Sequence, residues 1–191
     1  MIKEIIRKRM NESVDIKKSM IANEQIIELL EKLSIDMAEC LKAGRKFVIC
    51  GNGGSASDAL HFAGEVVGRF QKERLPWPAV VLNADVAVIT AIANDYGYNE
   101  VFSRQAEAHL QQQDFFIGIS TSGNSENILY AVDVAKRKGA KTVALLGRDG
   151  GRIGTKVDYP VIVPSNITAR IQESHIMIIH ILCELIEEMM G

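Results

Sequence analysis

The stretch Lys46–Glu65, KFVICGNGGSASDALHFAGE, passes from a short apolar run through a loop rich in glycine and serine into an amphipathic segment. This order predicts a buried strand, a tight turn and a helix. A helix that begins in this way offers backbone N–H groups and a partial positive charge to an anion. The stretch therefore predicts an α/β fold with a ligand-binding loop directly after its first strand.

Four further apolar runs of strand length follow along the chain, and helix-length amphipathic segments lie between most of them. The runs are 46–50, 78–83, 114–120, 141–147 and 158–164. The expected helices are 56–70, two within 84–111 broken near NDYGYN, 126–138 ending at Gly139, and 167–190. Such alternation predicts a doubly wound parallel sheet that is covered by helices on both faces.

The first part of the chain has a different pattern. Residues 2–43 carry two apolar stripes at helical spacing, and Gly44 supplies a stop signal. No internal repeat or linker interrupts the remainder. We expect a single domain over 1–191, with 1–44 as a helical N-terminal extension.

Composition excludes several classes of protein. The chain has 191 residues and a formal net charge of −2, so no strong field draws it to nucleic acid or to an anionic membrane. No apolar run approaches the ~18 residues of a membrane span, and the charged N-terminus does not resemble a signal peptide. The three cysteines, Cys40, Cys50 and Cys183, lie in apolar surroundings and are expected to be buried thiols. We expect a cytoplasmic protein.

A second loop, STSGNS at Ser120–Ser125, follows the third apolar run. Its hydroxyl groups and the start of the next helix indicate a phosphate site, although the serines alone would also serve as helix N-caps. The first loop matches a weak dinucleotide pattern, G-x-G-x-x-A. Its nearest acidic partner, Asp85, lies too far along the chain for that pattern. No nucleotide cofactor is expected.

Two segments carry side chains suited to acid–base or metal chemistry. His61 and Glu65 are four residues apart and share a helix face, where they indicate a base, a metal site or a simple surface pair. The last helix carries Gln172, His175 and His180, and His180 interrupts an apolar run, so it needs a polar partner. His109 is expected to be exposed.

These motifs together resemble a known family. The segments CGNGGSASDALHFAGE, TAIANDYGYNEVFSRQ, GISTSGNSENI, LLGRDGG and ARIQESHIMIIHILCELIE are similar to the phosphoheptose isomerases of the sugar isomerase (SIS) domain family, over about residues 2–188. The resemblance implies a flavodoxin-like five-stranded parallel sheet and a cytoplasmic homotetramer. It also implies conversion of sedoheptulose 7-phosphate to D-glycero-D-manno-heptose 7-phosphate, the first step towards the heptose of lipopolysaccharide cores and other surface glycans.

The resemblance also assigns residues. It implies that Glu65 and His180 form the acid–base pair. A zinc ion, one per subunit, would be bound by His61, Glu65, Gln172 and His180. The substrate contacts would be Asn52, Gly53, Gly54, Ser55, Glu65, Asn94, Asp95, Ser120, Thr121, Ser122, Ser125 and Gln172. Leu60 and Ala169 depart from residues common in the family, and Ala169 removes one expected substrate contact.

Two alternatives differ in function. One is a non-catalytic SIS-family adaptor that binds a protein such as a replication-initiation factor, and the other is an isomerase of a shorter sugar phosphate. The presence of His61, Glu65, Gln172 and His180 and the intact STSGNS loop argue against the adaptor, whereas a panel of substrates separates the isomerase of a shorter sugar phosphate.

Gln172 and His180 raise a geometric problem. Eight residues on one helix separate their Cα atoms by about 12 Å, too far for one metal ion. The helix is broken, one residue is not a ligand, or the two serve a site from different chains. We expect a homo-oligomer with sites at subunit interfaces and His180 from a neighbouring chain.

Overall fold

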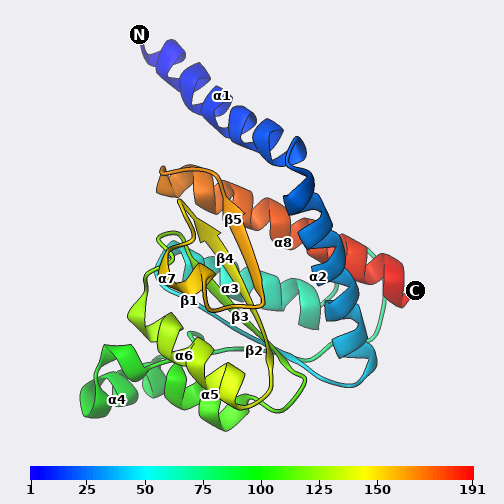
Figure 1. The fold of residues 1–191 in the computed structure, drawn as a ribbon, viewed down its shortest axis with the longest axis vertical. Coiled ribbons are helices and arrows are strands. Elements are labelled where there is room, and N and C mark those ends of the chain that lie inside the picture. The colour runs from blue at the N-terminus through cyan, green and yellow to red at the C-terminus, as the bar shows by residue number, and fades with distance from the viewer.

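The computed structural model describes residues 1–191 and contains a five-stranded, wholly parallel sheet between two layers of helices (Figure 1). The strands stand in the order β2-β1-β3-β4-β5. Their bounds are β1 (Phe47–Gly51), β2 (Ala79–Val81), β3 (Phe115–Ser120), β4 (Lys141–Gly147) and β5 (Tyr159–Val163). All five predicted strands are present, and the order is that of a flavodoxin-like doubly wound sheet, which confirms the predicted fold class.

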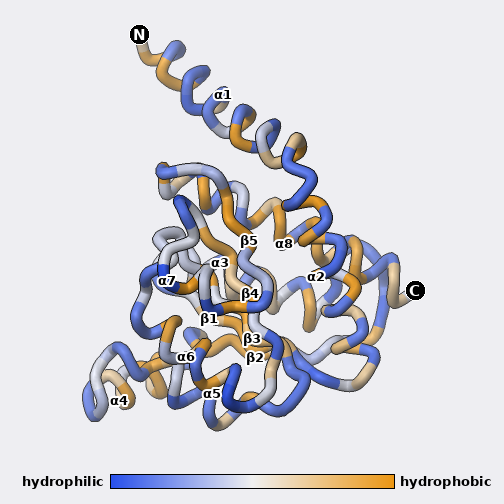
Figure 2. The backbone as a smooth tube through the Cα atoms, viewed as in Figure 1, coloured by the Kyte–Doolittle hydropathy of each residue, from blue (hydrophilic) through white to orange (hydrophobic).

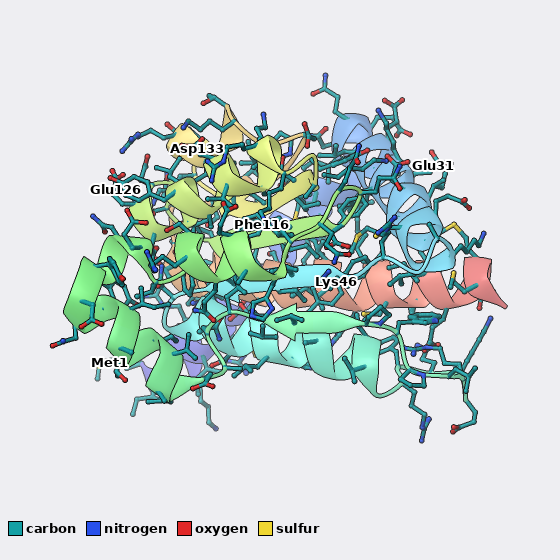
Figure 3. All side chains as sticks on the ribbon, turned by 90° about the horizontal axis from the view of Figure 1, so that it is seen from below. Met1, Glu31, Lys46, Phe116, Glu126 and Asp133 are labelled. Atoms are coloured by element: carbon teal, nitrogen blue, oxygen red, sulfur yellow. The ribbon has the colours of Figure 1, made fainter.

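Alternating side chains on each strand face two separate apolar cores. Phe47 and Ile49 of β1 face the core formed with α2 (Glu24–Lys42), α3 (Gly54–Val67) and α8 (Thr168–Met190). Val48 and Cys50 face the other core, formed with α5 (Ser103–His109) and α6 (Glu126–Arg137). Phe116, labelled in Figure 3, belongs to this second core. Because both faces are covered, the strands are apolar throughout, and this is why they appeared as continuous runs.

The N-terminal extension is helical, as predicted, and consists of two helices, α1 (Ile2–Ile21) and α2. The break comes at Asn23, whose side chain accepts a hydrogen bond from Ile26 N at 3.3 Å and so caps α2. Helix α1 projects from the body of the molecule, and only Met20 within it is buried (Figure 1). Its apolar residues therefore remain exposed along most of its length, as the orange segments of α1 in Figure 2 show.

The region between β2 and β3 contains the predicted pair of helices. Helix α4 (Val86–Tyr96) ends at Gly97, which has φ of 89°, and a 3₁₀ turn (Tyr98–Glu100) leads to α5. Helix α4 is rich in apolar residues, yet none of its residues is buried. A short helix, α7 (Gly151–Gly154), was not predicted, because a single turn leaves no periodic pattern in the sequence.

Helices α3 and α8 run side by side in a constant register. A Cβ atom built on Gly54 would lie 2.4 Å from Gln172 Nε2, at the start of α3. Seven residues later, His61 Nε2 lies 3.5 Å from His180 Nε2. Beyond the end of α3, the backbone N–H of Phe70 donates to Glu187 at 3.0 Å. The two helices therefore point in the same direction, and each turn of α3 faces a defined turn of α8.

The buried His175 makes the stability of this core depend on pH. Its Nε2 lies 2.9 Å from Leu146 O, and burial lowers its pKa from 6.5 to about 4. Since the unfolded chain binds this proton at higher pH than the folded chain, the stabilisation is complete above about pH 6.5 and is lost as the pH falls towards 4.

We expect His175→Gln, which keeps a donor for Leu146 O, to flatten the decline in the free energy of unfolding between pH 6.5 and 4. The wild-type decline attributable to this residue is at most about 1.4 kcal/mol per pH unit. Urea unfolding at several pH values measures it, with the exposed His109→Gln as control. Equal pH slopes for wild type and His175→Gln would contradict this account.

Candidate active site

The two predicted ligand loops meet where the chain leaves β1 and β3 in opposite directions. Strand β1 leads to α3 on one face of the sheet, and β3 leads to α6 on the other. This is the switch point, where ligands bind in sheets of this type. Reciprocal side-chain hydrogen bonds between Asn52 and Asn127, each 3.0 Å long, join the first loop to the first turn of α6, directly after the second loop. Tyr98 OH also donates to Asn52 Oδ1, at 2.9 Å.

The first loop is tightly held by its own backbone and by Asn83. Gly51 N donates to Asn83 Oδ1 at 3.1 Å, and Asn83 Nδ2 donates to Ala56 O at 3.2 Å. A side chain at Gly51 would meet Ser55 O at 2.3 Å, so the turn requires glycine. Gly53 has φ of 59° and supplies no side-chain cap to α3. The loop is therefore a fixed cradle at an uncapped helix start.

The second loop also begins a helix without a side-chain cap. Ser125 occupies the N-cap position of α6 but makes no capping hydrogen bond, and its Oγ instead lies 2.9 Å from Ser120 Oγ. The alternative that these serines serve only as N-caps therefore does not describe Ser125. Thr121 and Ser122 are half-buried beside them. Hydroxyl groups and an uncapped helix N-terminus are the donors that a phosphate requires.

The predicted acid–base residues form one compact cluster. His61 Nε2 lies 3.0 Å from Glu65 Oε1 and 3.5 Å from His180 Nε2. The nearest ligand atoms of all three residues lie within 4.8 Å of one another. His61 is exposed, whereas Glu65 and His180 are half-buried. A shared proton or a cation would stabilise such a close grouping of two imidazole nitrogens and a carboxylate oxygen.

The two spacings around His61 Nε2 suit a tetrahedral ion such as zinc, and the ligand atoms of Glu65 and His180 lie within 4.8 Å of each other. Two ligands at zinc–nitrogen distances of about 2.0–2.1 Å in tetrahedral geometry lie roughly 3.3–3.4 Å apart. The separations of 3.0 and 3.5 Å around His61 Nε2 are close to this value. Cys183 does not belong to this group of ligand atoms, and burial, followed by the charges of Glu65 and Glu187, raises the pKa of its thiol to about 12.

The expected origin of His180 in a neighbouring chain is wrong, because His61, Glu65 and His180 meet within one chain. Helix α8 is unbroken, as the geometric argument required, and Gln172 is the residue that is set apart. Its amide packs against Gly54, about 10 Å of helix axis from His61. The structure thus brings together three of the four expected zinc ligands and places Gln172 at the first loop.

Asn94 and Asp95 lie exposed at the end of α4, where Asn94 Nδ2 donates to Asp95 Oδ1 at 2.8 Å. No hydrogen bond links either residue to the two loops. Tyr98, a few residues later, makes the contact to Asn52 instead. His109 is exposed, as predicted.

Three side chains of the site were not identified from the sequence. Asn127 and Asn83 look like ordinary helix-start and loop residues, and only the fold shows that they brace the first loop. Phe70 follows α3, and its ring stacks on that of His180 with centroids 5.4 Å apart. From the sequence, the aromatic side chain of Phe70 could be expected only to be buried, because no spacing rule connects residue 70 to residue 180.

Comparison with known proteins places the chain in a family. A profile described as SIS domain matches residues 11–147. A phosphoheptose isomerase from Sulfurimonas denitrificans is 48% identical over 187 residues, covering 98% of this chain and 96% of the relative. The chain belongs to the phosphoheptose isomerase family of SIS-domain proteins.

Solved structures of this family have the same fold. A phosphoheptose isomerase from Francisella tularensis gives a TM-score of 0.92 at 36% identity, covering 98% of this chain and 99% of that one. A phosphoheptose isomerase from Neisseria gonorrhoeae gives a TM-score of 0.92 at 39% identity, covering 98% of this chain and 100% of that one. The resemblance found in the sequence is thereby confirmed, and this chain is an isomerase of that family.

The within-chain cluster predicts the result of mixing inactive subunits. We expect Glu65→Gln and His180→Gln chains to remain inactive after subunit exchange, because every site then lacks one of two groups that belong to the same chain. Exchange is verified by mass spectrometry of differently tagged chains, and activity is measured with sedoheptulose 7-phosphate. Recovered activity would show that the two groups act from different chains.

Proposed function

We propose that this protein converts sedoheptulose 7-phosphate to D-glycero-D-manno-heptose 7-phosphate. The observation that carries the proposal is the meeting of Glu65 with His61 and His180 in a chain of this family, with two uncapped loops at the switch point. An aldose–ketose isomerisation needs these parts: a base for a carbon-bound proton, an acid for the oxygens and a holder for the phosphate.

The phosphate belongs at the second loop. Ser120, Thr121, Ser122 and Ser125 supply hydroxyl donors there, and the start of α6 supplies a favourable partial charge. Asn52, Gly53, Gly54 and Ser55 of the first loop contact the sugar, with Gln172 across from Gly54 and with Asn94 and Asp95 from the end of α4. Binding the phosphate away from the reacting carbons helps to position those carbons.

Glu65 is the base in this proposal. It takes a proton from C1 of the ketose, exchanges it with solvent and delivers a proton to C2, while His180 exchanges protons with the two oxygens, so that the carbonyl moves from C2 to C1. Glu65 Oε1 faces His61, and no hydrogen bond engages its second oxygen, Oε2, which is left for the substrate.

A zinc ion, one per subunit, is proposed at His61, Glu65 and His180. When bound, the ion would supply positive charge that stabilises negative charge on the sugar oxygens. Three protein ligands leave a fourth position open, as catalytic zinc sites do. Gln172 packs on Gly54 of its own chain, so as a fourth ligand it would have to come from a neighbouring chain.

The alternative functions make different predictions. An adaptor that binds a replication-initiation factor needs no ionisable cluster or hydroxyl-rich loop, yet this chain has both the cluster of His61, Glu65 and His180 and the loop at Ser120–Ser125. An isomerase of a shorter sugar phosphate is distinguished by turnover with a panel of five-, six- and seven-carbon substrates.

No helix in the chain is long and apolar enough to cross a membrane. We propose a cytoplasmic enzyme that begins the synthesis of ADP- or GDP-heptose for lipopolysaccharide or other surface glycans.

We also propose that the chain assembles as a homotetramer. Ile6 and Met10 of α1 are 54% and 65% exposed on a helix that projects from the body, and α4 buries none of its apolar residues. A third apolar surface lies between α2 and α8, lined by Ile27, Leu30, Ile35, Ile181, Leu185 and Met189. Copies of the chain are the partners that the family relationship suggests for these faces.

Substitution of Ile6, an exposed apolar residue of α1, tests this assembly. We expect Ile6→Asp to shift the sedimentation coefficient from that of a tetramer to that of a smaller species, because a charge would be buried at the interface. Asn11→Asp, elsewhere on α1, is the control. A wild-type protein that sediments as a monomer would contradict the proposal.

Substitution of the base tests the chemistry. We expect Glu65→Gln to keep the fold and to bind the sugar phosphate, while turnover falls by about 10²–10⁴-fold. Calorimetry measures binding, and a coupled aldose assay measures turnover. Glu28→Gln, on the surface of α2, is the control, and near-normal turnover of Glu65→Gln would exclude Glu65 as the base.

Metal analysis tests the zinc site. We expect the purified protein to contain a divalent metal, most of it zinc, that His61→Gln fails to retain. Chelation should lower the activity, and added zinc should restore it. Full activity of a protein in which elemental analysis detects no metal would contradict the zinc site. The reaction would then proceed by acid–base catalysis without a metal ion.

A further inference from the structure

A buried carboxylate near the end of α8 is not used by the proposed chemistry. Glu187 is only 3% exposed. It accepts backbone hydrogen bonds from Phe70 N, Gln71 N and Lys72 N at 3.0, 2.8 and 2.9 Å. Arg74 Nε donates to it as well, at 2.9 Å. Four donors therefore fix a single carboxylate against the segment that follows α3.

The carboxylate is charged under all ordinary conditions. Burial alone would raise the pKa of Glu187, but the three backbone donors and Arg74 outweigh burial and lower it to about 2. A charged acceptor makes shorter and stronger hydrogen bonds than a neutral one. The segment from Phe70 to Arg74 is therefore held by a permanent ionic anchor.

Arg74 extends this anchor to the end of α3. Its two terminal nitrogens donate to Glu65 O at 2.7 Å and to Val66 O at 3.0 Å. The guanidinium also lies over the Trp77 ring, 3.5 Å from its centroid. Because helix ends leave carbonyls without partners, Arg74 fixes the last turn of α3, the turn from which the Glu65 side chain extends.

Phe70 extends the anchor to the other helix. The ring of Phe70 stacks on the ring of His180 at an interplanar angle of 29° and a centroid distance of 5.4 Å. The N–H of the same residue is bound to Glu187, two helical turns beyond His180 on α8. The position of the Phe70 ring therefore depends directly on the Glu187 carboxylate.

We propose that Glu187 is a positioning residue for the catalytic cluster. Through Phe70 it sets the ring of His180, and through Arg74 it sets the helical turn that carries Glu65. One carboxylate thus fixes the two proposed catalytic groups relative to each other, although it touches neither side chain. The proposal rests on the function proposed for this site, and its test includes a measurement that needs no turnover.

The test compares Glu187→Gln with Glu188→Gln. Both remove one carboxylate charge from neighbouring positions of α8, but the Glu188 side chain is 72% exposed and forms an ion pair with Lys72. In the metal-free protein labelled with ¹³C-histidine, the nuclear Overhauser effect between the His61 and His180 rings reports the geometry of the cluster, since their centroids are 5.2 Å apart. Turnover and KM for sedoheptulose 7-phosphate report its effect on the reaction.

We expect folded Glu187→Gln to lose most of that Overhauser effect and about 10- to 100-fold in kcat, as is typical for residues that orient catalytic groups. KM should change little, because the phosphate loop is untouched. Glu188→Gln should match the wild type. An unchanged Overhauser effect in folded Glu187→Gln would overturn the proposal. A wild-type protein that shows the effect but no turnover would instead contradict the proposed function.

If Glu187→Gln does not fold, the variant Phe70→Leu tests whether the segment anchored by Glu187 positions His180. This substitution leaves the Glu187 anchor in place and removes only the stacked ring, so the fold should be retained. We expect the contact between the His61 and His180 rings to weaken and kcat to fall. Wild-type values of both in Phe70→Leu would show that the anchored segment does not set His180, and would overturn the proposal.

Discussion

The parallel packing of α3 against α8 is the constraint on which the rest of the site depends. The two helices share one apolar core, in which Phe62 of α3 and Ile178 of α8 are fully buried. Since the helices keep a constant register, each polar residue on the facing sides meets one defined partner. The same packing holds Gln172 at the first loop and His180 at His61. The arrangement of loop and cluster is therefore fixed before any ligand binds.

The register of α3 against α8 explains why the expected origin of His180 in a neighbouring chain was wrong, although the spacing argument behind that expectation was correct. Helix geometry correctly implied that Gln172 and His180 cannot reach the same point from one unbroken helix. It could not say which of the two lies with His61 and Glu65, because that depends on how α8 is placed along α3. The sequence pattern of one helix gives the spacing of the residues along that helix, whereas the offset of one helix along another is set by tertiary packing.

The sheet itself was predictable because its signals are local. All five apolar runs became strands, and the loops after the runs 46–50 and 114–120 lie at the switch point, as parallel-sheet rules require. The residues that brace the site were not predictable. Asn127, Phe70 and Glu187 act across long separations in the chain, and each belongs to a residue type that is common in ordinary helices and loops. Two uncapped loops and one ionisable cluster together favour proton transfer on a phosphorylated sugar.

The most direct test of this account is turnover of sedoheptulose 7-phosphate in D₂O, followed by NMR. Proton transfer through an enediol predicts an aldose phosphate that carries deuterium at C2, and gradual labelling of the ketose at C1 as turnovers accumulate. Failure to form aldose, or aldose that stays free of deuterium after many turnovers, would contradict the account.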